Sequence, residues 1–215
     1  MSIRISKGDT EDGIVVGNAY DKYGSRNPIV RWMMGGFDDA LSTFVRKAAP
    51  TSIHEVGCGE GYWVMRWAQE GLAVRGCDFS SKVIRIARDN ATSAGLSEDL
   101  FRTRSIYDLQ APEDNADLVV CCEVLEHLES PELALQALQK VVGRSLILSV
   151  PREPLWCLLN CARGKYLGQL GNTPGHIQHW SKPGFIELVA KYFEVLEVSN
   201  PLPWTMLLCR PLKVR

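Results

Sequence analysis

The sequence has no long uninterrupted apolar run and no strong excess of charge of either sign. No stretch approaches the roughly 20 apolar residues that a membrane-spanning helix needs, and the opening MSIRISKGDTEDG lacks the apolar core of a secretory signal. The formal net charge is −1, so the chain lacks the basic balance typical of nucleic-acid-binding proteins. We therefore expect a cytoplasmic protein without a transmembrane segment, for which a nucleic-acid partner is not favoured.

Cysteine pairs are also lacking. The seven cysteines are odd in number and scattered, with no C-x-x-C pair: Cys58, Cys77, Cys121, Cys122, Cys157, Cys161 and Cys209. This usage predicts reduced thiols rather than disulfides. We interpret Cys58, Cys121 and Cys122 as packing residues, because no sequence neighbour would favour a thiolate at any of them.

What the chain does have is an alternation of strand-like and helical stretches over 215 residues, 46% of them hydrophobic. That length is enough for one domain with a large core. The strand-like runs are SIHEVG, LAVRGCD, LFRTRSI, DLVVCCEV and RSLILSV. Helical stretches or short turns separate most of these runs, so we expect an α/β fold with a doubly wound parallel sheet covered by helices on both faces.

Local signals place several helices and a hairpin. The run VRWMMGGFDDALSTFVRKA has helical spacing interrupted by Gly35 and Gly36, which predicts a helix or a helix pair within an N-terminal lid segment, 1–48. Residues 49–215 form the predicted main domain. Ser80, Ser130 and Ser181 are expected to begin helices, and Gly95 and Gly143 to end two of them. The ending FEVLEVSNPLPWTMLLCRP predicts a hairpin at a sheet edge.

The segment HEVGCGEGYW, 54–63, ends the first strand of the predicted sheet in a turn with glycines at alternate positions. It lacks the lysine of a phosphate-binding loop and the G-x-G-x-x-G spacing of a dinucleotide fold. A carboxylate at Glu55 would repel a pyrophosphate and stabilise a cation. S-adenosylmethionine, which carries a sulfonium and an ammonium, fits such a turn, although glycine triplets also occur in turns that bind nothing.

Asp78 ends the next strand-like run, about 20 residues beyond the glycines, where a strand-end carboxylate can bind ribose hydroxyls. The alternative is that Asp78 only caps the following helix.

Four segments, HEVGCGEGYW, VRGCDFS, DLVVCCEVLEHL and LILSVP, together resemble the signature segments of the class I S-adenosylmethionine-dependent methyltransferases between residues 52 and about 151. The resemblance implies a Rossmann-like seven-stranded sheet whose last strand is antiparallel. It also implies the set of cofactor contacts: Glu55, Gly57, Gly59 and Gly61 around the methionine part, Asp78 on the ribose, Phe79, Ser105 and Ile106 around the adenine, and Cys122 beside the transferred methyl group.

The segment AYDKYGSRNP is lid-like in this setting, and Tyr20 and Tyr23 are available to close over the cofactor. A surface aromatic cluster covering the sheet is the equal alternative for these two side chains.

Methyl transfer to a hydroxyl benefits from a base that accepts its proton. Of the four histidines, His54 lies within the first strand of the predicted sheet and is interpreted as a structural, hydrogen-bonded residue. Glu123, Glu126 and His127 follow a strand at i, i+3 and i+4, so one helical turn would place them on one face. The loop GNTPGHIQHWSKPGF adds His176 and His179.

Three interpretations of this group stay open. Glu123, Glu126, His127 and His176 could bind Mg²⁺ or Mn²⁺. The pattern E-x-x-E-H, with a later histidine and W-[ST]-[KR]-x-x-F, is similar to that of metal-dependent RNA 2′-O-methyltransferases; His176 and Trp180 match it and His179 does not. His127, His176 and Glu123 could instead act without metal, as in the ubiquinone-biosynthesis O-methyltransferases that EVLEHL also resembles. The third interpretation is structural, with His127 tucked under the sheet.

The segment 152–180 contains PREPLWCLLNCARGKYLG and is predicted to be an insert that roofs the acceptor site. Its leucines could instead pack in the core, or bind a partner or membrane-associated substrate with Arg152, Arg163 and Lys165 contacting acidic groups. Taken together, the sequence predicts a methyltransferase that uses S-adenosylmethionine on a small or lipid-linked acceptor, at oxygen. The alternatives are a metal-dependent RNA 2′-O-methyltransferase and a non-catalytic cofactor-binding module.

Overall fold

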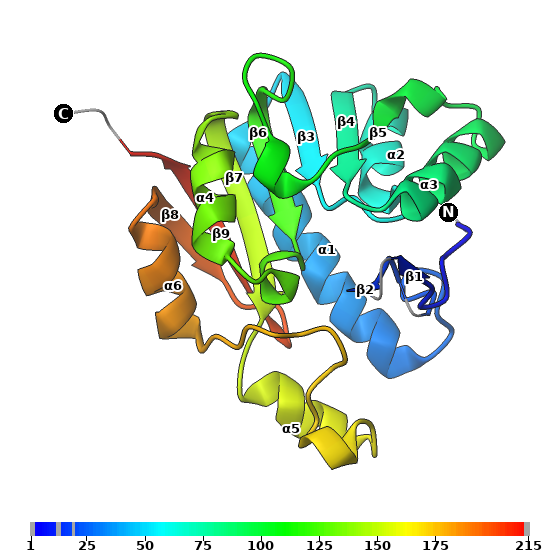
Figure 1. The fold of residues 1–215 in the computed structure, drawn as a ribbon, viewed down its shortest axis with the longest axis vertical. Coiled ribbons are helices and arrows are strands. Elements are labelled where there is room, and N and C mark those ends of the chain that lie inside the picture. The colour runs from blue at the N-terminus through cyan, green and yellow to red at the C-terminus, as the bar shows by residue number, and fades with distance from the viewer. Residues whose placement is uncertain (1–2, 12–13, 19, 213–215) are drawn as a thin grey trace.

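The computed structural model describes residues 3–11, 14–18 and 20–212. Its centre is a seven-stranded sheet in the order β5-β4-β3-β6-β7-β9-β8 (Figure 1). All neighbouring pairs from β5 to β7 are parallel, and β9 is antiparallel to both of its neighbours. This confirms the predicted sheet with an antiparallel last strand. The strands are β3 (Ser52–Val56), β4 (Ala73–Asp78), β5 (Phe101–Thr103), β6 (Ala116–Cys122), β7 (Val142–Pro151), β8 (Phe193–Ser199) and β9 (Trp204–Pro211).

Helices cover both faces of this sheet because successive strand side chains point to opposite sides. On β6, Leu118 and Val120 pack with α1 (Pro28–Ala48) and α2 (Tyr62–Gln69). Val119 and Cys121 of the same strand pack with the helices of the other face. These helices are α4 (Pro131–Gln139) and α6 (Lys182–Ala190), while α3 (Ser81–Ser93) lies with α2 in a smaller cluster. Both faces of the sheet are therefore buried.

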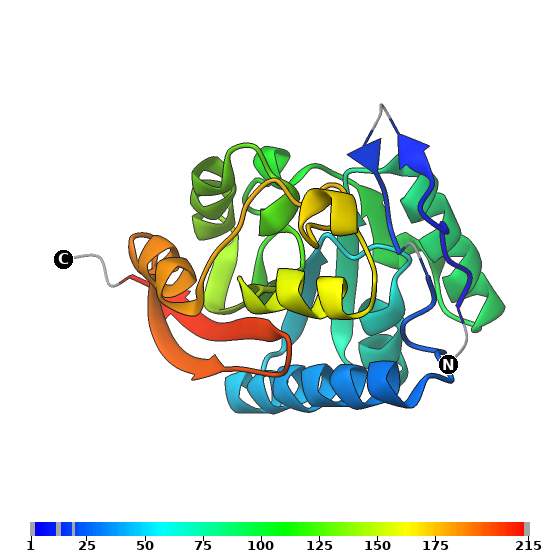
Figure 2. The same cartoon turned by 90° about the horizontal axis from the view of Figure 1, so that it is seen from below.

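The remaining elements lie at the ends of the sheet. They are the two-stranded pair β1 (Thr10–Glu11) and β2 (Ile14–Val15), the helix α5 (Leu155–Ala162), and the 3-10 turns η1 (Glu98–Leu100), η2 (Ile106–Asp108), η3 (Leu125–His127) and η4 (Leu167–Gln169). Figure 2 looks onto the edge formed by the carboxyl ends of the parallel strands. It shows α5 and the chain after it lying across this edge, with β1 and β2 to one side. Among the described residues, no helix combines the length and apolarity required to cross a membrane.

The N-terminal helix runs through Gly35 and Gly36 without a break, so the helix-pair alternative is wrong. Two interior glycines cost about 1 kcal/mol each relative to alanine. Burial of one apolar face, including Phe37 and Leu41, against the sheet outweighs this cost. Asn27 begins the helix, and its side chain accepts hydrogen bonds from the first turn.

The predicted helix ends are only partly right. Ser80 and Ser181 cap α3 and α6 through side-chain hydrogen bonds, and Gly95 follows α3 with a left-handed φ of 73°. Ser130 precedes α4, but its side chain makes no capping bond. Gly143 does not end that helix: it lies in β7, where a Cβ would come within 2.8 Å of the Ala116 oxygen. A strand irregularity beside Ala116 brings the two backbones this close.

Two further strand predictions have different outcomes. The run LFRTRSI is strand only over Phe101–Thr103, because the chain then turns at Ser105 into η2. The C-terminal hairpin is confirmed, with β8 as the sheet edge and β9 between it and β7.

Candidate functional site

The site lies where the strand order switches direction. β3 pairs with β4 on one side and with β6 on the other, so the loops that follow these strands diverge and leave a crevice at their carboxyl ends. The glycine turn follows β3 directly. Its first two amides, of Gly57 and Cys58, both donate to the Cys77 oxygen at 2.8 and 2.9 Å, which fastens the turn to β4.

The three glycines of this turn are needed for two different reasons. Gly57, Gly59 and Gly61 all have left-handed backbones, with φ values of 76°, 52° and 85°. A Cβ on Gly57 or Gly61 would collide with Val124 or with the ring of Phe101, at 2.3 and 2.5 Å. The nearest atom to a Cβ on Gly59 is 3.9 Å away. Gly59 therefore marks the open side of the turn, where a ligand can approach the backbone.

Asp78 joins the glycine turn to the end of β4. One carboxylate oxygen accepts from the Gly59 amide at 3.1 Å and the other from the Ser80 amide at 3.0 Å. Because Ser80 is the residue that caps α3, the alternative that made Asp78 the cap is wrong. Burial raises the pKa of Asp78, whereas the two amide bonds oppose that rise. The adjacent Phe79 ring is 48% exposed and available to a flat ligand.

Glu55 is a buried carboxyl that forms no ion pair with any of the described residues. The residue is 5% exposed, and its Oε2 atom has no hydrogen-bond partner among the described residues. Burial raises the pKa of Glu55 to about 8, and the Lys22 ammonium acts in the opposite direction. A cation bound here would stabilise the ionised carboxylate, as the sequence argument expected.

The remaining predicted cofactor residues differ in how far they are exposed. Cys122 is half-buried at the end of β6, and burial raises the pKa of its thiol. Ser105 caps η2 through the Tyr107 amide, and Ile106 is buried in the larger core cluster. Tyr20 is 53% exposed. Their roles toward a cofactor stay predictions.

The N-terminal segment is fastened to the crevice by contacts that the sequence did not reveal. Glu60, inside the glycine turn and 1% exposed, accepts from the backbone amides of Ser6 and Asn18 at 3.0 and 2.7 Å. The Tyr23 ring stacks on Tyr62 of α2 with centroids 3.7 Å apart. An acid within a glycine turn was the available signal for Glu60. Its partners were unpredictable because they lie more than 40 residues away in sequence.

A second group of side chains lies beyond the end of β6. Glu126, His127 and His176 each offer a ligand atom, and these atoms all lie within 4.8 Å of one another. The two imidazole rings meet edge to face, with centroids 4.9 Å apart. His127 is exposed, so the interpretation that tucked it under the sheet is wrong.

Glu123 is not part of this group. Its two oxygens accept hydrogen bonds from Ser149 Oγ at 2.8 Å and Trp204 Nε1 at 2.6 Å. The predicted helical turn that would have aligned it is wrong, because Glu123 has a φ of 60° and only Leu125–His127 is helical, as a 3-10 turn. The predicted set of four ligands therefore reduces to three.

The pKa shifts of these three side chains suit either a general base or the binding of a cation. Burial lowers the pKa of His176 to about 3. The pKa of His127 is also lowered, because surrounding protein groups partly desolvate its ring although the residue as a whole is exposed. The Nδ1 atom of His127 lies 2.9 Å from the Gly175 carbonyl, which only accepts, so Nδ1 carries the proton and Nε2 is the basic nitrogen. Burial, followed by the Glu123 carboxyl, raises the pKa of Glu126 well above its usual range.

A divalent cation fits these three side chains. Glu126 is 1% exposed and neither of its oxygens has a hydrogen-bond partner among the described residues, which is costly for a carboxyl unless a cation or a proton compensates. Two imidazoles and one carboxylate favour Mn²⁺ over Mg²⁺, since Mg²⁺ prefers oxygen ligands.

Within the insert 152–180, Trp156 of α5 covers His176. The Trp156 indole stacks on the His176 ring and donates to Thr173 Oγ1 at 2.9 Å. The one buried residue of α5 is Asn160, whose amide donates to the Gly171 oxygen, while Leu158 is 62% exposed. Core packing of the insert leucines is therefore wrong. His54, by contrast, is structural as predicted, being 1% exposed and bonded through Nδ1 to the Asp114 oxygen.

Comparison with known proteins agrees with this geometry. Residues 54–145 match the family described as Methyltransferase domain. The chain is 36% identical over 133 residues to the ubiquinone biosynthesis O-methyltransferase of Paracidovorax citrulli (strain AAC00-1), covering 60% of this chain and 55% of the relative. For the enzyme of the same name from Xanthomonas euvesicatoria the values are 29% identity, 57% and 52%. The chain thus spans about half the length of these curated relatives.

Solved structures show the same fold at low identity. Magnesium protoporphyrin IX methyltransferase from Synechocystis PCC 6803, with bound SAH, superposes with a TM-score of 0.65 at 20% identity, covering 88% of this chain and 90% of that chain. The glycine turn and the strand-end acid Asp78 lie within the matched residues 54–145. Residues 54–145 of the chain therefore form a class I S-adenosylmethionine-dependent methyltransferase domain.

Proposed function

We propose that the chain transfers the methyl group of S-adenosylmethionine to a hydroxyl oxygen of a small or lipid-linked acceptor. The observation that carries the proposal is the buried Glu55 carboxyl, whose Oε2 has no hydrogen-bond partner among the described residues, beside the open Gly59 backbone at the sheet's switch point. A ligand with a sulfonium and an ammonium supplies positive charge that stabilises the ionised form of this buried carboxyl. The names of the curated relatives support an oxygen acceptor.

Each part of the cofactor has a candidate partner. Glu55 and the glycine turn face the charged methionine part. The Asp78 carboxylate, held by two backbone amides, retains lone pairs for ribose hydroxyls. Phe79, Ser105 and Ile106 border the adenine side, Cys122 borders the methyl group, and Tyr20 belongs to the segment that would close over it.

The acceptor oxygen would attack the methyl carbon in line with the departing sulfur, so that the carbon–oxygen bond forms as the carbon–sulfur bond breaks. The hydroxyl proton passes to a base, and the basic Nε2 of His127 is the candidate, with His176 orienting the acceptor beneath Trp156. Depressed pKa values keep both imidazoles neutral at pH 7. Glu123, bonded to Ser149 and Trp204, shapes the floor of the crevice.

A metal-assisted version of the same reaction is the second candidate, and the grouping of Glu126, His127 and His176 favours it. Mn²⁺ or Mg²⁺ held there would lower the pKa of the acceptor hydroxyl. The methyltransferase domain of bacterial CtHen1-CN has the same fold, with a TM-score of 0.60 at 19% identity over 83% of this chain. An RNA acceptor would additionally require binding that weakens steeply with salt.

Calorimetry tests the proposal. The chain is titrated with S-adenosylmethionine and with its demethylated product, each with and without Mn²⁺. Glu55→Lys should abolish cofactor binding, because it places an ammonium beside the positively charged part of the cofactor. His176→Ala should leave cofactor binding intact and lower turnover at least tenfold. A chain that binds neither cofactor form contradicts the enzyme proposal. A chain that binds both but methylates nothing in a cell extract supplied with labelled cofactor is the non-catalytic module.

A further inference from the structure

A second group of metal-ligating side chains lies outside the site described above. Glu153, Cys157 and His179 each offer a ligand atom within 4.8 Å of the others. The Glu153 Oε1 atom lies 3.3 Å from Cys157 Sγ and 3.5 Å from His179 Nδ1. Nothing in the methyl-transfer chemistry uses these three residues.

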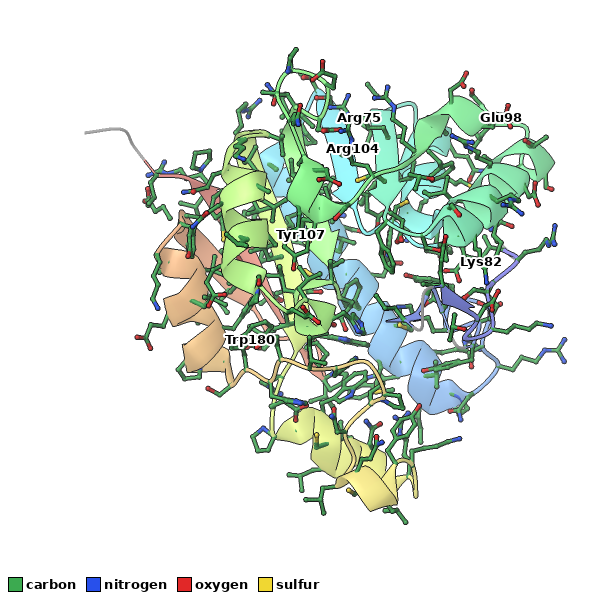
Figure 3. The ribbon with its side chains drawn as sticks, in the orientation of Figure 1. Arg75, Lys82, Glu98, Arg104, Tyr107 and Trp180 are labelled. Atoms are coloured by element: carbon green, nitrogen blue, oxygen red, sulfur yellow. The ribbon has the colours of Figure 1, made fainter. Side chains whose placement is uncertain are left out.

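The backbone brings these residues together at the neck of the insert 152–180. Arg152 and Trp180 form an isolated β-bridge, and the Glu153 amide donates to the Trp180 oxygen at 3.0 Å. The Cys157 amide, in the first turn of α5, donates to Glu153 Oε2 at 3.2 Å. Figure 3 shows Trp180 where the insert returns to the sheet, just before α6. The donor atoms are therefore positioned by both ends of the insert.

The spacing and the chemistry of the donors match a tetrahedral zinc site. Zinc bonds of about 2.0 Å to nitrogen and oxygen and 2.3 Å to sulfur, at a tetrahedral angle, place neighbouring donors about 3.3–3.5 Å apart. The two distances from Glu153 Oε1, 3.3 and 3.5 Å, fall in this range. Thiolate, imidazole and carboxylate are the donors that zinc takes in proteins, whereas a thiolate is a poor ligand for Mg²⁺.

We propose that Glu153, Cys157 and His179 bind Zn²⁺ at the neck of the insert, with the fourth position open on the exposed side of His179. The side chain of His179 is 40% exposed, so an ion can enter from solvent. The bound ion would cross-link the start of α5 to the segment before α6. The ion would thereby fix Trp156 over His176 without contacting either residue. Binding of the ion does not depend on methyl transfer.

Binding must displace a proton from the thiol. Without metal, the Cys157 thiol donates a hydrogen bond to the Glu153 carboxylate. The ion forms a bond to sulfur as the S–H bond releases its proton to solvent.

Cobalt spectroscopy tests the site directly, because sulfur and non-sulfur ligands give different spectra. The full chain, reduced and freed of metal by a chelator, is titrated with Co²⁺. One equivalent should produce a thiolate-to-cobalt charge-transfer band in the near ultraviolet together with strong visible bands of four-coordinate cobalt. Zn²⁺ should then bleach both. The Glu126, His127 and His176 group contains no sulfur and cannot produce the ultraviolet band.

Four variants assign the ligands. Cys157→Ser should remove the ultraviolet band, and His179→Gln should weaken cobalt binding at least tenfold. Cys161→Ser, one helical turn along α5, and His176→Asn, in the other group, should leave the band unchanged. Circular dichroism confirms that each variant is folded. The proposal is overturned if the folded wild-type chain gives no thiolate band, or if the band survives Cys157→Ser.

Discussion

The indole ring of Trp156 stacks on the imidazole ring of His176, with centroids 5.8 Å apart and planes 27° apart. This contact, between two residues of the insert, places the helix α5 directly on a predicted catalytic side chain. It also contributes to the burial that lowers the pKa of His176 to about 3. The roof of the site and the basicity of its imidazole are therefore linked.

Replacing Trp156 tests that link. Trp156→Leu removes the stacked ring and the hydrogen bond to Thr173, so water should reach His176 and raise its pKa toward the ordinary value of about 6.5. Proton-detected titration of the histidine ring signals measures this shift. Leu158→Ala, on the exposed side of α5, is the matched control and should leave it unchanged. An unaltered His176 titration in Trp156→Leu would show that the insert does not control the site.

The buried Glu55 carboxyl predicts a stability that falls as the pH rises. Its pKa is about 8 in the folded chain against an ordinary value of 4.5, so between these values the folded state binds more protons than the unfolded state. The free energy of unfolding should then decrease with pH over this window, by up to about 1.4 kcal/mol per pH unit from this group.

The matching experiment compares urea unfolding from pH 5 to pH 8 in the wild type, Glu55→Gln and Glu98→Gln. Glu55→Gln should make the dependence shallower, leaving the part that comes from the other buried acids, whereas Glu98→Gln, at the exposed corner formed by η1 (Figure 3), should reproduce the wild-type slope. In the presence of S-adenosylmethionine the wild-type slope should also flatten, because the cationic ligand favours the ionised carboxylate. Equal slopes in all three chains would contradict the proposed charge of the site.

Alanine substitutions at Gly59 and at Gly71 distinguish the effect of backbone strain from the effect of ligand contact. Both have left-handed φ values, 52° and 83°, and neither would bring a Cβ closer than 3.9 Å to another atom. Alanine at either position should cost about 1–2 kcal/mol of stability. Only Gly59→Ala places its methyl group on the open side of the cofactor turn, so it alone should weaken S-adenosylmethionine binding, by at least tenfold. Thermal unfolding and calorimetry of the two variants measure these effects, and equal cofactor affinities would remove Gly59 from the site.

The sequence was most informative where a short pattern specifies its own geometry. Apolar runs predicted β6 and β7, and the glycines after the first strand of the sheet predicted a turn, which the structure shows at Gly57, Gly59 and Gly61. The pattern Glu-x-x-Glu-His predicted that Glu126 and His127 would meet His176, which the structure shows.

What the sequence could not predict depends on contacts between distant residues. Glu123 leaves the predicted group because Ser149 and Trp204, from β7 and β9, bind its carboxylate. The interruption expected at Gly35 and Gly36 does not occur, because packing against the sheet overrides local propensity. The Cys157 and His179 pairing with Glu153 was equally hidden, since residues 153 and 179 meet only when the insert closes on itself.

Lys22 provides a final prediction about the choice between cofactor and product. Burial raises the pKa of Glu55, Glu123 and Glu126, and the Lys22 ammonium opposes this rise in all three. A cation that interacts with these carboxyls should also repel the sulfonium of S-adenosylmethionine, whereas the demethylated product has a neutral sulfur. Lys22→Met should therefore shift the affinity ratio toward S-adenosylmethionine by about two- to tenfold, the range for charges several ångströms apart at an effective dielectric constant near 20.

Lys140→Met, on the exposed end of α4, should leave the ratio unchanged. Calorimetry with both ligands measures the ratio; a shift toward the product would mean that Lys22 binds the cofactor's carboxylate rather than opposing its sulfonium.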